Sequence, residues 1–98
     1  MARWLVAFVL VVATASCTPP PPRATASDAA RANVALADLE RGRTLLLNRC
    51  SSCHRAPMPA DQRASNWPHE VADMAARAKI DDAQQHLITL YLVAMSTH

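Results

Sequence analysis

The sequence is poor in glycine and in aromatic residues. Its 98 residues include one glycine, one tyrosine, one phenylalanine and two tryptophans. No run alternates polar and apolar residues over about five positions between turn residues, so a chain built mainly of β-strands is excluded. The formal net charge is only +2 at pH 7. This balance argues against nucleic acid as a partner, because nucleic-acid binding calls for a strongly basic surface.

The sequence also lacks an apolar run long enough to stay in a membrane as a helix. The longest run covers residues 4–13, whereas a spanning helix needs roughly 20 apolar residues. Arg3 precedes the run, and the small pair Ala15-Ser16 follows it. This order is typical of an export signal that is later removed. We therefore expect residues 1–16 to be a signal peptide.

The first of three cysteines, Cys17, directly follows the small pair. Thr14-Ala15-Ser16-Cys17 resembles the lipobox of bacterial lipoproteins, which implies that Cys17 is acylated and becomes the new N-terminus. Without lipid, Cys17 would be a free thiol in an oxidising compartment. Because Thr18 rather than Asp follows, the resemblance implies a periplasmic protein anchored to a membrane, the outer in preference to the inner. Ordinary cleavage nearby is the alternative.

Four consecutive prolines follow at residues 19–22. No apolar periodicity is evident from there to about residue 32, and proline-rich segments form extended, semi-rigid spacers. We therefore predict that residues 17–32 form an extended or disordered tether. It would hold a folded domain, residues 33–98, off the membrane surface.

The other two cysteines lie in Cys50-Ser51-Ser52-Cys53-His54, a CxxCH motif typical of c-type haem attachment. Two thiols at this spacing can reach both vinyl groups of one haem, and the adjacent histidine can then bind the iron as proximal ligand. The chain thus resembles the cytochrome c family. The resemblance implies one covalent haem c, bound by Cys50, Cys53 and His54.

Helical periodicity predicts three main helices. They cover about residues 32–49, 66–78 and 82–95, with Ser65 or Asn66 as the cap of the second and Asp81 or Asp82 as the cap of the third. The expected fold class is all-α. More specifically, the resemblance implies a small cytochrome c-like domain in which three main helices pack around one covalently attached haem.

The only glycine, Gly42, lies inside the first predicted helix, where it costs about 1 kcal/mol relative to alanine. In the cytochrome c family, a glycine eight residues before the first haem cysteine lets the C-terminal helix cross at close range. Gly42 and Cys50 reproduce that spacing. The resemblance implies that Tyr91 lies over Gly42 and that Leu46 faces the haem. A surface glycine and ordinary core packing of Tyr91 are the alternatives.

Met74 is the favoured second axial ligand. Trp67, Val71 and Met74 form one apolar stripe along the second predicted helix. A Trp-Pro pair followed by Val and then Met resembles short cytochrome domains in which that methionine binds the iron. The alternative is that Met74 only fills the core, as methionines on apolar stripes often do.

Two other residues compete for the same position. Met58 lies only four residues after His54, so the chain would have to pass around the haem edge to bring its sulfur to the opposite face. His69 lies about 140° around the helix from Met74, so both residues cannot face one haem. These positions disfavour Met58 and His69 as the second axial ligand, but both remain alternatives to Met74.

A haem with histidine and methionine ligands has no open coordination site and exchanges electrons through its edge. The resemblance therefore implies an electron carrier rather than an enzyme. Its partners would be a redox donor and acceptor or a dehydrogenase or oxidase complex. A haem-based gas sensor would follow if the distal site were open. A zinc or thiol redox module using Cys50 and Cys53 is less favoured, because the sequence lacks a second CxxC and a βαβ context.

Overall fold

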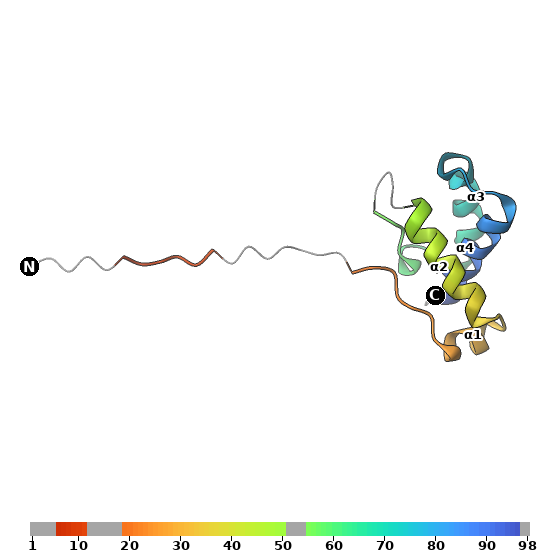
Figure 1. Ribbon diagram of the computed structural model, residues 1–98, viewed down its shortest axis with the longest axis horizontal. Helices are drawn as coiled ribbons and strands as arrows, with labels where there is room; N and C mark the ends of the chain where they lie inside the picture. Colours follow the sequence, from red (N-terminus) through yellow and green to blue (C-terminus); the bar gives the residue numbers. More distant parts are fainter. Residues whose placement is uncertain (1–5, 12–18, 51–54, 97–98) are drawn as a thin grey trace, which may run out of the picture.

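The computed structural model describes residues 6–11, 19–50 and 55–96. Within these ranges it contains helices and no strand, so the predicted all-α class is confirmed there (Figure 1). The α-helices are α1 (Ala26–Ala32), α2 (Leu36–Cys50), α3 (Trp67–Ala78) and α4 (Asp82–Met95). Two 3-10 turns, η1 (Pro59–Asp61) and η2 (Ala64–Asn66), connect α2 to α3.

Helix α1 lies in the segment for which the sequence predicts an extended tether. That prediction is wrong for Ala26–Ala32. The Thr25 hydroxyl accepts a hydrogen bond from the Asp28 backbone N–H at 3.2 Å, and the Asp28 carboxylate accepts one from the Thr25 backbone N–H at 2.8 Å. This reciprocal cap satisfies two N–H groups that a helix start leaves open. The bond from Thr25 also lowers the pKa of the Asp28 carboxyl.

The turn between α1 and α2 explains why the first predicted helix is not continuous. Asn33 adopts a left-handed conformation with φ of 55°, and its N–H bonds the last carbonyls of α1. Asparagine tolerates this conformation better than most residues. The chain therefore ends one helix at Ala32 and begins the next at Leu36, instead of running unbroken from about residue 32.

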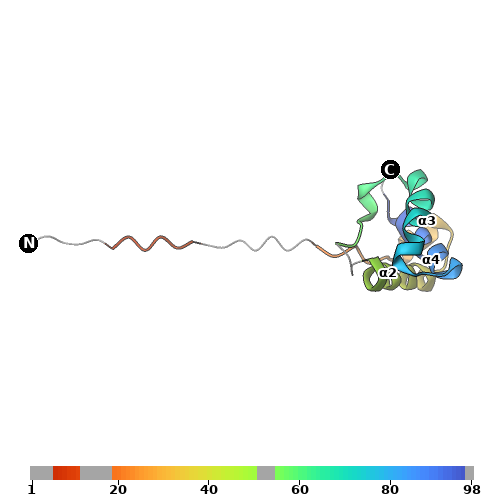
Figure 2. The same cartoon turned by 90° about the horizontal axis from the view of Figure 1, so that it is seen from above.

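Helix α4 packs against each of the other three α-helices and lies at the centre of the bundle (Figures 1 and 2). Two reciprocal hydrogen bonds fix its start. The Asp81 carboxylate accepts a hydrogen bond of 2.8 Å from the Gln84 backbone N–H, and the Gln84 side-chain oxygen accepts one of 3.0 Å from the Asp81 backbone N–H. Of the two caps that the sequence leaves open, the structure uses Asp81.

Helices α2 and α4 cross at close range at Gly42. Gly42 is buried there, and a Cβ atom placed on it would lie 2.9 Å from Tyr91 Cβ and still closer to the Leu87 carbonyl oxygen. Only a residue without a side chain permits this approach. The prediction that Tyr91 lies over Gly42 is confirmed.

Two groups of buried apolar side chains stabilise the fold. The site cluster joins α2, α3, α4 and the loop after the motif, and consists of Leu46, Ala56, Trp67, Val71, Ile88, Tyr91 and Leu92. A second, smaller group joins α1 to α2 and α4 through Ala29, Leu39 and Ala94. Across the described segments, every helix falls short of the length and apolar character that a membrane crossing requires.

Candidate cofactor site

Cys50 is the last residue of α2 and is the part of the CxxCH motif that the structure describes. Its side chain is half-buried and packs against the site cluster. Cys53 and His54 lie outside the described residues, as does Cys17. The site is therefore built from Cys50 on one side and from the chain that resumes at Arg55 on the other.

The Cys50 thiol is not part of a disulfide. Burial raises the pKa of this thiol above its ordinary value of 9.0, because the apolar surroundings disfavour the thiolate. The fold thus disfavours the thiolate of Cys50 relative to the unfolded chain.

The loop after the motif turns back into the core within a few residues. Ala56 is buried in the site cluster, and Pro59 is fully buried. The indole Nε1–H of Trp67 donates a hydrogen bond of 3.1 Å to the Pro59 carbonyl oxygen. Trp67 is the first residue of α3, so this bond fixes the loop to the start of that helix.

Met58 occupies the middle of this loop and is half-buried. Its backbone N–H donates to a carboxylate oxygen of Asp61 at 2.9 Å, which fixes the start of η1. The structure therefore gives Met58 a defined place in the connection between the motif and α3. Met58 stays a competing candidate for the distal iron ligand.

Helix α3 places two residues of the predicted stripe, Trp67 and Val71, in the site cluster, whereas Met74 is not among the side chains packed against that cluster. Trp67 and Val71 are each 2% exposed, and Met74, one turn further along, is half-buried. His69 lies on a different face: its side chain is 80% exposed and its Nε2 lies 3.1 Å from a carboxylate oxygen of Asp73. The prediction that His69 faces away from the apolar stripe is confirmed. The role of Met74 as an iron ligand stays a prediction.

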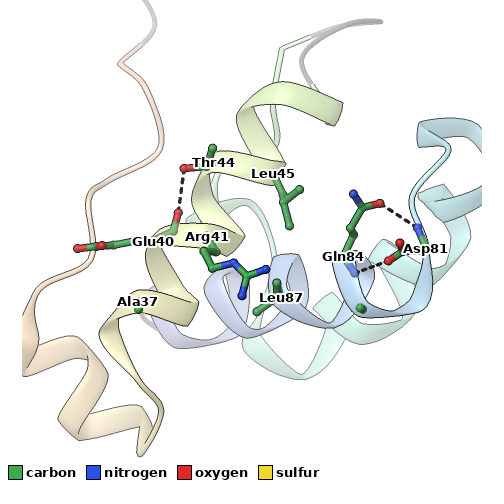
Figure 3. Close-up of a pocket in the computed structure, with 9 residues that line it drawn as sticks. Ala37, Glu40, Arg41, Thr44, Leu45, Asp81, Gln84 and Leu87 are labelled. Atoms are coloured by element: carbon green, nitrogen blue, oxygen red, sulfur yellow. Dashed lines mark hydrogen bonds between the residues drawn. The ribbon is translucent and has the colours of Figure 1, made fainter.

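Other features of the described chain are separate from this site. A groove of about 690 Å³ between α2 and the start of α4 is lined by Glu40, Arg41, Leu45, Asp81 and Leu87, among others (Figure 3). Neither Cys50 nor Met74 lines it. Within the described ranges, no three His, Cys, Asp or Glu side chains come together as a metal site would require. A zinc site would therefore have to use residues of the motif that lie outside those ranges.

The sequence interpretation missed one set of contacts near the α2–α4 crossing. The guanidinium of Arg43 donates from Nε to the Pro21 carbonyl at 2.9 Å, and the Tyr91 hydroxyl donates to the Pro22 carbonyl. These partners are 22 and 69 positions apart in the chain, so no local pattern reveals them. The signal that was available is the Thr25-x-x-Asp28 capping box, which predicts a helix start after the prolines.

Comparisons of the chain with protein-family models, with curated proteins and with solved structures found no match. The resemblance to cytochromes c therefore rests on the CxxCH motif, the Gly42 spacing and the α3 stripe.

Proposed function

We propose that this chain is a small monohaem c-type cytochrome that carries electrons and is anchored by a lipid on Cys17 to a membrane facing the periplasm. The observation that carries the proposal is the position of the motif. Cys50 ends α2, half-buried beside an apolar cluster to which α2, α3 and α4 all contribute. A covalently held haem needs a thiol placed beside apolar walls, and Cys50 meets that requirement.

The chemistry of the donor set fits a haem. Cys50 and Cys53 would form the two thioethers, His54 would be the proximal ligand and Met74 the distal one. When bound in this way, a haem supplies reversible one-electron transfer at its iron. The described part of this set is a thiol outside any disulfide and a half-buried thioether, Cys50 and Met74.

The surrounding side chains have their own roles in this proposal. Leu46, Trp67 and Val71 are buried beside Cys50 in the site cluster and exclude water from that side. Low water access and a low local dielectric favour the less charged state of a redox group. The bond from Trp67 to Pro59 fixes the loop that follows His54, and so limits the movement of the chain around the site.

The test of the cofactor is its covalent attachment. Protein matured in a periplasm should keep its chromophore through acid-acetone extraction, because thioether bonds survive this treatment. A variant with both Cys50→Ala and Cys53→Ala should retain no haem. A chromophore that the solvent strips from the wild type would refute c-type attachment.

The distal ligand separates an electron carrier from a gas sensor. The oxidised wild type should show the near-infrared sulfur-to-iron band expected of His/Met ligation, as the resemblance implies. Met74→Ala should abolish this band and let the reduced protein bind carbon monoxide, while Met58→Ala and His69→Ala should keep the band. Loss of the band in Met58→Ala instead would assign the ligand to the loop, and carbon monoxide binding by the reduced wild type would favour a sensor.

A further inference from the structure

The proline-rich segment before α1 is built into the folded domain. Pro21 is buried, and its carbonyl oxygen accepts a hydrogen bond from Arg43 of α2. The next carbonyl, that of Pro22, accepts from the hydroxyl of Tyr91 of α4. Proline has no backbone donor, so its carbonyl is the one backbone group through which it can be held. The two helices that meet at Gly42 thus also hold the arriving chain.

Helix α1 continues this attachment. Ala29 is buried against Leu39 of α2 and Ala94 of α4. The Arg31 guanidinium donates a hydrogen bond of 2.9 Å to the Ala94 carbonyl oxygen. From Pro21 to the end of α1, the chain therefore contacts the same two helices through backbone carbonyls, a buried apolar side chain and a charged donor.

We infer that residues 21–32 form a strap that holds the domain against the membrane surface, instead of a free tether that holds it away. The inference rests on the lipid anchor at Cys17 that belongs to the proposed function. Between Cys17 and Pro21 the chain can extend about 12 Å at 3.1 Å per residue. A fully extended segment up to residue 33 would instead reach about 50 Å.

The strap also selects which side of the domain faces the lipid. In both views the strap reaches the domain on the side that carries the loop from Arg55 to Met58 (Figures 1 and 2). The loop that follows the haem motif is therefore held toward the membrane, and the occupant of this side is the bilayer surface.

Arg23 makes the strap testable, because trypsin cleavage of the Arg23–Ala24 bond would separate the domain from its anchor. Arg23 is exposed, yet cleavage requires the flanking chain to leave its contacts, so the rate follows local opening. In lipidated protein on vesicles of phosphatidylethanolamine and phosphatidylglycerol, we expect slow release of a fragment beginning at Ala24. Tyr91→Phe should speed its release about fivefold, the effect of one lost hydrogen bond.

A matched control is Thr89→Val, which removes a hydrogen bond between the Thr89 hydroxyl and the Gln85 carbonyl within α4. Thr89 lines a pocket with Pro68 and His86 to which no residue of the strap contributes. This variant should release the fragment at the wild-type rate. Unchanged haem absorption and helix content in Tyr91→Phe would show that only the strap has loosened. Equal release rates in Tyr91→Phe, Thr89→Val and wild type would overturn the strap.

The distance from the lipid is tested separately by comparing vesicles with detergent micelles. If the bilayer shields the strap, cleavage at Arg23 should be several-fold faster in micelles, and insertion of about 15 Gly and Ser residues after Thr18 should remove the difference. An equal rate on vesicles and in micelles without the insertion would overturn the surface position. Vesicle binding by Cys17→Ala as complete as that of the wild type would instead refute the lipid anchor, leaving the strap to be judged from the cleavage rates in solution.

Discussion

The two halves of α2 lie in different surroundings. Around Gly42, α2 is in direct backbone contact with α4, with no room for even a Cβ atom on residue 42. At Cys50, the same helix ends half-buried beside an apolar cluster, next to the motif to which we assign a haem. The contact at Gly42 is therefore made by the protein alone, whereas the packing at the C-terminal end of α2 would depend on the cofactor under the proposed function.

The sharpest way to break this comparison is to place a side chain at the crossing. Gly42→Ala would bring a Cβ atom to 2.9 Å from Tyr91 Cβ and even closer to a backbone oxygen of α4. Overpacking of this kind costs about 3 kcal/mol or less when the backbone can shift. We expect the urea midpoint of unfolding to fall accordingly. Thr44→Ala, an exposed position two residues along the same helix, should change stability far less, and a Gly42→Ala protein as stable as wild type would contradict the close crossing.

The substitution Trp67→Phe tests the other region, the site cluster beside Cys50 at the C-terminal end of α2. It removes the indole N–H that satisfies the Pro59 carbonyl in a buried position, which costs about 1–3 kcal/mol when a partner is left unpaired. We expect lower stability together with faster hydrogen exchange in the residues around Pro59. Exchange in the part of α2 around Gly42 should change less. Equal effects in both regions would show that the two halves of α2 do not respond separately.

The pH dependence of the unfolding free energy tests the burial of the Tyr91 hydroxyl at the crossing. Burial raises the pKa of its hydroxyl from 10.0 to about 12, although the nearby Arg43 acts in the opposite direction. A raised folded pKa means that folding favours the neutral phenol, so this stabilisation is complete below pH 10 and is lost as the pH rises toward 12. Unfolding free energy measured across this range should decline in wild type and decline less in Tyr91→Phe. Parallel curves for the two proteins would contradict the burial of the hydroxyl.

The smallest expected effect concerns the Cys50 thiol in haem-free protein. Because burial raises its pKa, alkylation by iodoacetamide should be slower in the folded than in the urea-unfolded chain, and its rate should rise at a higher pH. Cys17→Ala with Cys53→Ala leaves Cys50 as the reacting thiol. A rate equal to that of the unfolded chain would mean that the end of α2 is open without haem.

Several elements could be predicted because a single local signal determined them. The spacing of Trp67, Val71 and His69 separated the two faces of α3, which is a matter of helical period. The crossing of Gly42 with Tyr91 followed instead from the resemblance to the cytochrome c family, carried by the distance of the lone glycine from Cys50.

The segment before α2 was mispredicted because its composition and its caps gave opposite indications. Four prolines favour an extended chain, but Thr25 and Asp28 begin a helix immediately after them. The contacts of Pro21 and Pro22 join residues far apart in the chain, and such pairings depend on the tertiary fold. The assignment of Met74 as iron ligand stays a prediction, because a half-buried methionine fits a core position as well as a ligand.

The α2–α4 crossing has a consequence for the order of maturation. Gly42 meets Leu87 and Tyr91 only after the chain through α4 has been made and has folded back, and contacts between such distant residues form slowly. Until then the side chain of Cys50 is open to solvent. Afterwards it is half-buried, and burial raises the pKa of the thiol, which disfavours the reactive thiolate. Under the proposed function, we therefore expect thioether formation to precede closure of the crossing, so that haem attachment is a step in the folding pathway of this protein.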